Sequence, residues 1–126
     1  MDFKDTIQQI AEKIAKQKDS IATEEATKTS FVMPVIAALG YDVFNPFEVV
    51  PEMDCDLVKR KGEKIDYAIM KDENPILLIE CKHCKQNLNL HDTQLQRYFV
   101  ASKARFGVLT NGIEYSFYTC LLYTSP

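Results

Sequence analysis

Two carboxylates and one ammonium group stand in or beside two apolar segments. Asp66 lies inside the segment 64–70, and Glu80 and Lys82 lie at the end of the segment 75–82. Both segments are short and rich in β-branched or aromatic residues, which predicts two strands. The polar residues between them lead into a proline, a composition typical of a hairpin turn. We therefore expect two neighbouring strands that carry three charged groups.

Side chains alternate along a strand, so Glu80 and Lys82 share one face and Cys81 lies on the other. If the two strands pair, Asp66 lies beside Glu80. Two adjacent carboxylates repel each other and raise each other's pKa, and a hard divalent cation with oxygen ligands removes that cost. A neighbouring lysine can then orient or deprotonate a water molecule. This pattern favours metal-dependent phosphodiester hydrolysis, with a surface salt bridge as the alternative.

A second chemistry is suggested by the cysteines. Cys81 and Cys84 form a C-x-x-C pair, and Cys55, His83 and His91 are further ligand candidates for zinc. Zinc sites usually combine four ligands from two such pairs, and the spacing here does not match one. A redox pair usually opens a helix, whereas the first cysteine is expected in a strand. We expect reduced, buried cysteine, and a small zinc or thiol-redox protein is the less favoured hypothesis.

Length and charge limit the possible classes of protein. A chain of 126 residues suits one domain with a single core, and the net charge of −3 does not by itself indicate nucleic-acid binding. Local basic patches can still attract a polyanion, although a solvated turn is the alternative. The basic residues are clustered: Lys59, Arg60, Lys61 and Lys64 precede the apolar part of the Asp66 strand, and Lys82 and Lys85 flank His83. The sequence has no apolar run long enough for a membrane span and no signal peptide, so we expect a cytoplasmic protein.

The first third of the chain predicts helices. Residues 1–19 show an amphipathic pattern that favours a helix packed onto the domain, with a dimer seam as the alternative. Thr23 is a good N-cap for a second helix that ends at Gly40, and Pro34 should kink or divide it. The apolar face of that helix would comprise Phe31, Val32, Val35, Ile36 and Leu39. The segment 41–53 then predicts one strand, or two short ones, at the sheet edge.

The last third predicts one more helix and two more strands. Asn89 or Asp92 can cap the helix. The apolar segment 106–110 indicates a buried strand, and Asn111-Gly112 is a strong hairpin signal for a return strand over 113–119.

We interpret the final residues as foreign to the natural protein. Residues 120–126 match one reading frame of a common sequencing adapter. We therefore assign a single domain to residues 1–119, treat 120–126 as an adapter-derived tail outside the fold, and expect the natural protein to continue beyond Thr119.

Several short motifs together resemble a known nuclease family. Asp66 followed after a hairpin by Glu80-Cys81-Lys82 resembles the PD-(D/E)xK motif, with Ile65 in place of the motif's proline. The wider set resembles the N-terminal nuclease domain of type I restriction enzyme R subunits and related stand-alone predicted restriction endonucleases. The resemblance extends from about residue 21 to 119 and rests on these segments: 23–28, 39–43, 62–69, 79–82, Gln94 with Tyr98, and 109–112.

The resemblance implies an α/β, restriction-endonuclease-like core, a central mixed β-sheet flanked by α-helices. It implies a Mg²⁺-dependent DNA endonuclease of a restriction or defence system, with Mn²⁺ able to substitute. Asp66 and Glu80 would hold the metal with the backbone carbonyl of Cys81, and Lys82 would position the attacking water. A glutamate on the early helix would be an additional catalytic acid, with Glu25 preferred and Glu24 as the alternative.

The same resemblance implies supporting residues and partners. Gln94 and Tyr98 match a Gln-x-x-x-Tyr feature with a supporting or DNA-contacting role, and we group Lys64, Lys85 and Arg97 with them. The expected partners are DNA and a homodimer or larger restriction complex, with no membrane. The R subunit's helicase motor is not part of this sequence, so no nucleotide cofactor is expected. A non-catalytic nucleic-acid-binding or assembly module with the same fold is the main alternative.

Overall fold

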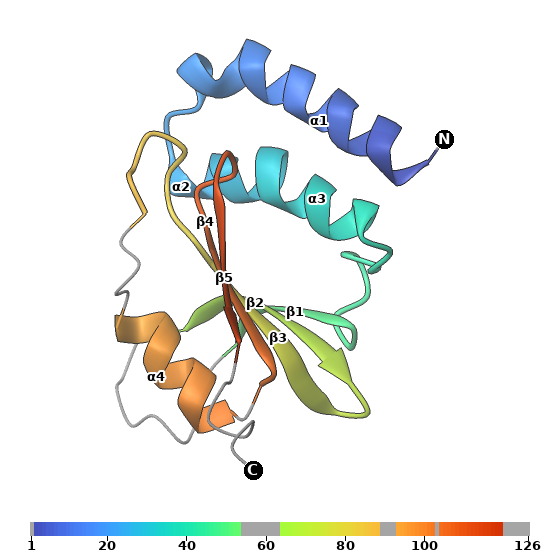
Figure 1. Cartoon of the computed structure of the whole chain (residues 1–126), viewed down its shortest axis with the longest axis vertical. Helices are drawn as coiled ribbons and strands as arrows, with labels where there is room; N and C mark the ends of the chain where they lie inside the picture. Colours follow the sequence, from blue (N-terminus) through green and yellow to red (C-terminus); the bar gives the residue numbers. More distant parts are fainter. Residues whose placement is uncertain (1, 54–63, 89–92, 103, 120–126) are drawn as a thin grey trace.

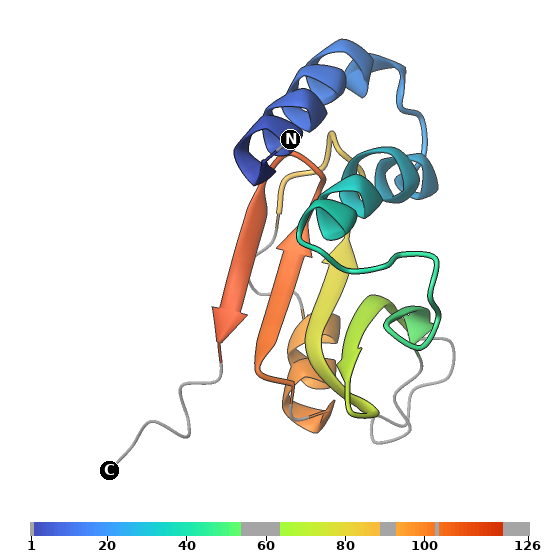
Figure 2. The same cartoon turned by 90° about the vertical axis from the view of Figure 1, so that its right-hand side faces the viewer.

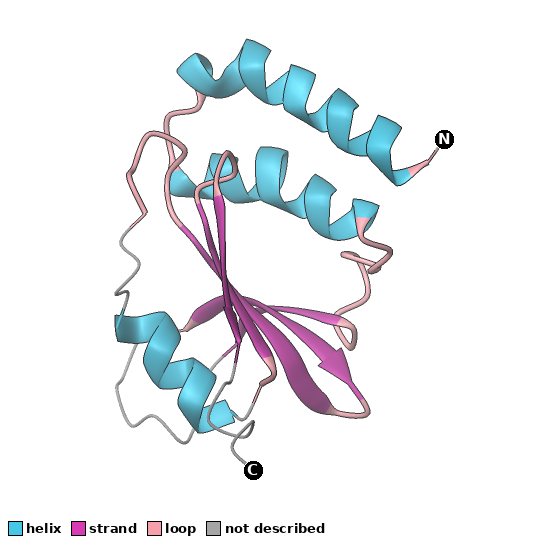
Figure 3. Cartoon of the chain, viewed as in Figure 1, coloured by secondary structure: helices cyan, strands magenta, loops and turns pink. Residues whose placement is uncertain are grey.

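The computed structural model describes residues 2–53, 64–88, 93–102 and 104–119. In this part of the chain, helices lie on both sides of a five-stranded sheet (Figures 1 and 3). The helical elements are α1 (Phe3–Gln17), η1 (Lys18–Ser20), α2 (Glu24–Thr27), η2 (Lys28–Val32), α3 (Met33–Ala38) and α4 (Thr93–Ser102). The strands are β1 (Val49–Met53), β2 (Ile65–Lys71), β3 (Asn74–Cys81), β4 (Phe106–Thr110) and β5 (Tyr115–Thr119).

The sheet has the strand order β1-β2-β3-β4-β5 and is mixed. β1 pairs antiparallel with β2, and β2 pairs antiparallel with β3. β3 and β4 are parallel because the chain crosses over through α4, and β5 returns antiparallel to β4. This arrangement confirms the predicted α/β, restriction-endonuclease-like fold.

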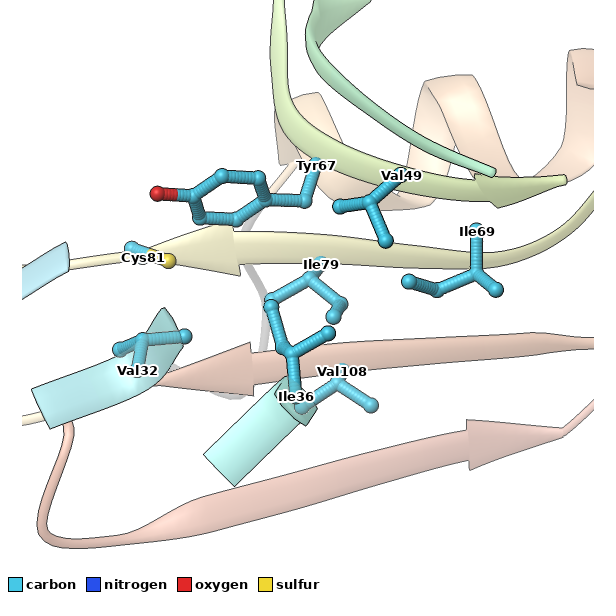
Figure 4. Packing of buried hydrophobic residues seen from close by; sticks show 8 residues of the cluster. All are labelled: Val32, Ile36, Val49, Tyr67, Ile69, Ile79, Cys81 and Val108. Carbon is cyan, nitrogen blue, oxygen red and sulfur yellow. The ribbon is translucent and has the colours of Figure 1, made fainter. Parts of the chain in front are cut away.

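The helices form a layer on each face of the sheet. α2, η2 and α3 cover one face, α4 covers the other, and α1 lies outside α3 (Figures 1 and 2). Each face has its own apolar cluster. In the first, Val32 and Ile36 point from the helical layer towards Ile79 and Val108 of the sheet (Figure 4). In the second, Leu95 of α4 packs on the opposite face.

α1 confirms the predicted amphipathic helix. The Asp2 carboxylate caps it by accepting the Asp5 N–H at 2.8 Å. Its isoleucines Ile7, Ile10 and Ile14 are only partly buried, and none of the fifteen residues of this helix is fully buried. The helix therefore contributes an outer layer against α3, as expected for packing onto the domain.

The second predicted helix is divided. Thr23 caps its start by accepting the Ala26 N–H at 3.0 Å, as predicted. The chain then widens into the π-helical η2 before α3 resumes around Pro34. Proline has no N–H for the carbonyl of Ser30, and that carbonyl accepts the Lys13 ammonium of α1 at 3.4 Å. The proline thus explains the division of the helix.

One expectation for the end of this helix is wrong, and the edge strand expected after it is confirmed over a shorter range. Leu39 was expected on the apolar face but is 53 % exposed. The predicted strand or strands over 41–53 reduce to β1, because Asp42 accepts the Phe44 N–H and Asn45 accepts the Phe47 N–H, each at 3.0 Å. These side-chain bonds favour turns over a strand ladder, and both phenylalanines are largely exposed.

Some sequence-based expectations lie outside the described residues. They concern the basic residues 59–61, the capping candidates Asn89 and Asp92, the ligand candidates Cys55 and His91, and the tail 120–126. Within the described ranges, no helix has both the length and the apolar character that crossing a bilayer requires.

The Asn111-Gly112 turn between β4 and β5 confirms the hairpin prediction. The Asn111 side-chain oxygen accepts the backbone N–H groups of Ile113 and Glu114 at 3.0 and 2.8 Å. Gly112 has a φ of 86°, and a β-carbon built on it would lie 2.9 Å from Cβ of Phe31. Both the backbone conformation and the contact with the helical layer therefore require glycine.

We predict that Gly112→Ala destabilises the protein more than Gly40→Ala. Gly40 also has a positive φ, 102°, but among the described residues no heavy atom lies within 4 Å of an added β-carbon. The control should lose about 1–2 kcal/mol from the backbone conformation alone, and Gly112→Ala should lose about 1–3 kcal/mol more from overpacking against Phe31. Urea unfolding of both variants measures the difference, and equal losses would contradict the proposed contact.

Candidate active site

The candidate site lies where β2 and β3 part. The hairpin forms as predicted, and its register runs from the Lys71–Asn74 pair to the Tyr67–Ile79 pair. Asp66 and Glu80 are the next residues towards the divergent end. There the Asp66 carboxylate accepts the Cys81 N–H through Oδ2 at 2.7 Å. A side chain, rather than the backbone of the neighbouring strand, thus satisfies this N–H, and it holds the carboxylate at the end of β3.

Lys82 is the next residue after Cys81, and its backbone is hydrogen-bonded to β4, on the side of β3 opposite to β2. Its N–H donates to the Thr110 carbonyl of β4 at 2.8 Å. Since successive N–H groups along a strand point to opposite sides, the N–H of Cys81 points towards β2 and that of Lys82 towards β4. The backbone that carries Lys82 is therefore fixed between two strands.

The residues after Lys82 attach this segment to the helical layer. The Cys84 N–H donates to Oγ1 of the fully buried Thr27 at 3.1 Å. The His83 ring accepts the Lys85 N–H through Nδ1 at 3.0 Å, so its Nε2 carries the proton and donates to the Ile21 carbonyl at 3.0 Å. His83 is partly buried and connects the loop to the segment before α2.

Lys28 extends from η2 into the same site. Its ammonium lies 2.9 Å from Oε1 of Glu25 and 3.1 Å from Oδ1 of Asp66, and only 6 % of its side chain is exposed. It also lies 5.5 Å from the centre of the Tyr67 ring. Burial by itself lowers the pKa of Lys28, but the hydrogen bonds and charges of the two carboxylates outweigh burial and raise the pKa above its ordinary value.

Sequence reasoning did not single out Lys28. It stands three residues after Glu25, a spacing that pairs charges on one helical face. That spacing predicts only a surface pair, whereas the contact with Asp66 depends on how η2 packs against the sheet. The available signal was therefore local and incomplete.

Glu80 is buried, with 5 % of the residue exposed. Its charge and that of Asp66 both act on the thiol of Cys81: burial raises the thiol pKa most, followed by Asp66 and then Glu80. The two carboxylates therefore flank the same residue, as the predicted hairpin implied. The raised pKa also keeps this thiol protonated and unreactive.

The cysteine geometry gives little support to zinc or redox chemistry. Cys81 and Cys84 are both buried free thiols, and Sγ of Cys84 lies 3.7 Å from the carbonyl of Lys18. Within the part of the chain that the structure describes, no three side chains of histidine, cysteine, aspartate or glutamate form a metal-binding group. The oxygen atoms of Asp66, Glu80 and the Cys81 backbone are instead ligands suited to a hard cation such as Mg²⁺ or Mn²⁺.

The two glutamates at the start of α2 have different environments. Glu25 bonds Lys28, and its side chain is 74 % exposed. The pKa of Glu24 is raised, first by burial and then by the charge of Asp66, while Lys82 and Lys28 lower it in part. Glu24 is also exposed, but its charge interacts with those of Asp66 and Lys82, whereas the hydrogen bond of Glu25 connects it to the site through Lys28.

α4 supports the site from the opposite face. Nε2 of Gln94 donates to the Lys64 carbonyl at 2.7 Å and so holds the chain two residues before Asp66. Tyr98 is 1 % exposed inside the cluster of that face, which favours a supporting role. Arg97 on the same helix is partly buried.

Two of the predicted DNA-contacting lysines face solvent. Lys64 and Lys85 are both exposed, one just before β2 and the other in the loop after Lys82. Asp66, Glu80 and Lys82 are thus buried or partly buried, whereas these two lysines and Glu25 are exposed beside them.

Comparison with known proteins identifies the family. Residues 44–124 match the family model described as type I restriction enzyme R protein N terminus. The matched range contains all five strands, α4, and the residues Asp66, Glu80 and Lys82. Searches of curated proteins and of solved structures found no match. The match extends over more than half of the sequence, and the chain therefore belongs to the family of type I restriction enzyme R protein N termini.

Proposed function

We propose that this nuclease-related restriction domain is a Mg²⁺-dependent DNA endonuclease that hydrolyses phosphodiester bonds. The observation that carries the proposal is the position of Asp66, Glu80 and Lys82 at the point where β2 and β3 part. Two carboxylates that can bind a divalent ion, beside a lysine that can orient a water molecule, form a set suited to metal-dependent phosphodiester hydrolysis.

Asp66, Glu80 and the Cys81 carbonyl would hold the metal. The N–H and C=O of one strand residue point to the same side, so the Cys81 carbonyl faces the side on which Asp66 accepts its N–H. Mg²⁺, or Mn²⁺ in its place, would supply positive charge for the scissile phosphate and the leaving oxygen. The three ligands are hard oxygen donors, which fits either ion.

Lys82 would orient the attacking water and offset charge that develops on the phosphate. Its backbone is fixed by the Thr110 carbonyl, and the loop that follows is fixed by Thr27 and His83. A fixed backbone limits the region that the ammonium of this flexible side chain can reach, which favours catalysis by positioning.

DNA is the proposed partner, and the exposed Lys64 and Lys85 would contact its phosphates. Double-strand cleavage needs a site for each strand, so a homodimer or a larger restriction complex is the proposed assembly. No nucleotide cofactor is proposed for this domain.

A second candidate function is a non-catalytic DNA-binding or assembly module of the same fold. The observation that favours it concerns Asp66, because both of its oxygens already have partners: Oδ2 accepts the Cys81 N–H and Oδ1 pairs with Lys28. The charge of this site is therefore partly compensated before any metal binds.

We predict that Lys82→Ala and Asp66→Asn each lower cleavage of supercoiled plasmid by about 100-fold or more, since each removes a group that stabilises the transition state. The assay compares Mg²⁺ or Mn²⁺ with EDTA. Lys71→Ala is the matched control, because it removes an exposed lysine at the other end of β2. Equal cutting by the wild type and both site variants would rule out this assignment, and no cutting by a folded wild type would favour the non-catalytic module.

A separate prediction concerns the glutamates of α2. Glu24→Gln should lower the cleavage rate by about tenfold or more, roughly 1.4 kcal/mol in the barrier, because this side chain interacts with both Asp66 and Lys82. Glu25→Gln should have a smaller effect, since the hydrogen bond of Glu25 is to Lys28, which is not one of the proposed catalytic groups. Single-turnover rates of the two variants decide between them, and the reverse order would make Glu25 the catalytic acid.

DNA binding should depend on salt whichever of the two functions holds. We expect log K to fall linearly with log salt concentration, and Lys64→Ala and Lys85→Ala should each reduce the slope by about one phosphate contact. Fluorescence anisotropy with a short duplex in EDTA measures the slope. A slope that neither variant changes would show that these two lysines do not contact phosphates.

A further inference from the structure

We propose that Lys28 pairs with the Asp66 carboxylate in the metal-free protein. When a divalent ion binds, the Lys28 ammonium leaves Asp66 and pairs with Glu25 alone. Lys28 thereby sets the metal affinity of the site without being a metal ligand. This inference rests on the proposed function, because it takes Asp66 as a metal ligand.

The ammonium of Lys28 lies between two carboxylates of different character. Asp66 is held at the end of β3, and 16 % of its side chain is exposed, whereas the side chain of Glu25 is 74 % exposed. The two contacts, 3.1 Å to Asp66 and 2.9 Å to Glu25, are of similar length. Lys28 can therefore give up the contact with Asp66 and keep its charge compensated by Glu25.

A metal at Asp66 and the ammonium of Lys28 compete for the same oxygen. Oδ2 of Asp66 already accepts the Cys81 N–H, so Oδ1 is the oxygen better placed to coordinate an ion. Lys28 occupies that oxygen in the structure. Two cations on one carboxylate oxygen repel each other strongly at a partly buried position, and metal binding must therefore displace the ammonium.

The charges of the site are consistent with this exchange. Asp66 and Glu80 are matched by the two ammonium groups of Lys28 and Lys82. Adding Glu24 and Glu25 leaves two negative charges when all six groups are ionised, and one divalent ion neutralises them. The negative charges of the α2 glutamates can thus balance the positive charge of Lys28 once Asp66 has bound metal.

A purely structural ion pair predicts something different. If Lys28 only tied η2 to β2, its removal would lower stability by the same amount with and without metal. If Lys28 competes with the metal, its removal lowers the stability of the metal-free protein and increases the stabilisation that metal adds. Metal-linked stability therefore separates the two roles without measuring activity.

The test measures Mn²⁺ affinity by titration calorimetry, and melting temperature in EDTA and in saturating Mn²⁺. We expect Lys28→Met to have a lower melting temperature than the wild type in EDTA, and a larger rise in melting temperature when Mn²⁺ is added. It should bind Mn²⁺ about tenfold more tightly, a difference of about 1.4 kcal/mol. Lys28→Arg keeps the positive charge and should bind Mn²⁺ no more tightly than the wild type. Equal or weaker Mn²⁺ binding by Lys28→Met would overturn the inference.

A second test uses a Glu25 variant and does not require that Lys28→Met folds. Glu25→Gln removes the second partner of Lys28 and should weaken Mn²⁺ binding several-fold, and unchanged binding overturns the inference. In the Lys28→Met background the same change should have no effect, because Glu25 acts only through the lysine. An effect that persists there would make Glu25 a metal ligand and overturn the inference.

Failure of the proposed function has a different signature. Asp66→Asn should abolish the Mn²⁺ response of the wild type. If the folded wild type shows no Mn²⁺ binding, or if Asp66→Asn binds as well as the wild type, the proposed metal site is wrong and the inference falls with it. If Asp66 is required but Lys28→Met binds like the wild type, only the inference about Lys28 fails.

Discussion

The hydrogen bond from the Cys81 N–H to the Asp66 carboxylate is the interaction on which the candidate site depends. The paired register of β2 and β3 ends at Tyr67 and Ile79. A backbone N–H at this buried place needs an acceptor, and leaving it unsatisfied would cost about 1–3 kcal/mol. The aspartate side chain meets that need and at the same time places a carboxylate at the end of β3. One contact thus completes the strand and positions the proposed metal ligand.

The sheet and the helical layers on its two faces hold the residues around this hydrogen bond in place. β4 fixes the backbone of Lys82 from the opposite side, and Gln94 holds the chain where it enters β2. The helical layer adds Thr27, which accepts the N–H of Cys84, and Lys28, which pairs with Asp66. Each of the three layers of the fold therefore contributes to the position of a proposed catalytic group. The contacts that hold the candidate site therefore come from several elements of the fold rather than from one loop.

Local signals in the sequence were sufficient for much of the fold. The cap at Thr23, the turn at Gly112 and the hairpin that carries Asp66 depend on neighbouring residues, and all three were predicted correctly. The edge strand expected within 41–53 is present only over Val49–Met53, because side-chain hydrogen bonds at Asp42 and Asn45 favour turns before it. The contact between Lys28 and Asp66 could not be predicted, because it joins residues far apart in the sequence and depends on the packing of η2. The location of the candidate site was therefore readable from the sequence, but its charge balance was not.

The most direct test of the proposed metal site is the anomalous diffraction signal of crystals of the protein grown or soaked with Mn²⁺. We expect an Mn²⁺ ion coordinated by carboxylate oxygens of Asp66 and Glu80 and by the Cys81 carbonyl, with the Lys28 ammonium paired with Glu25 alone. The proposal would be contradicted by a structure at saturating Mn²⁺ that has no ion between Asp66 and Glu80 and in which Lys28 still pairs with Asp66.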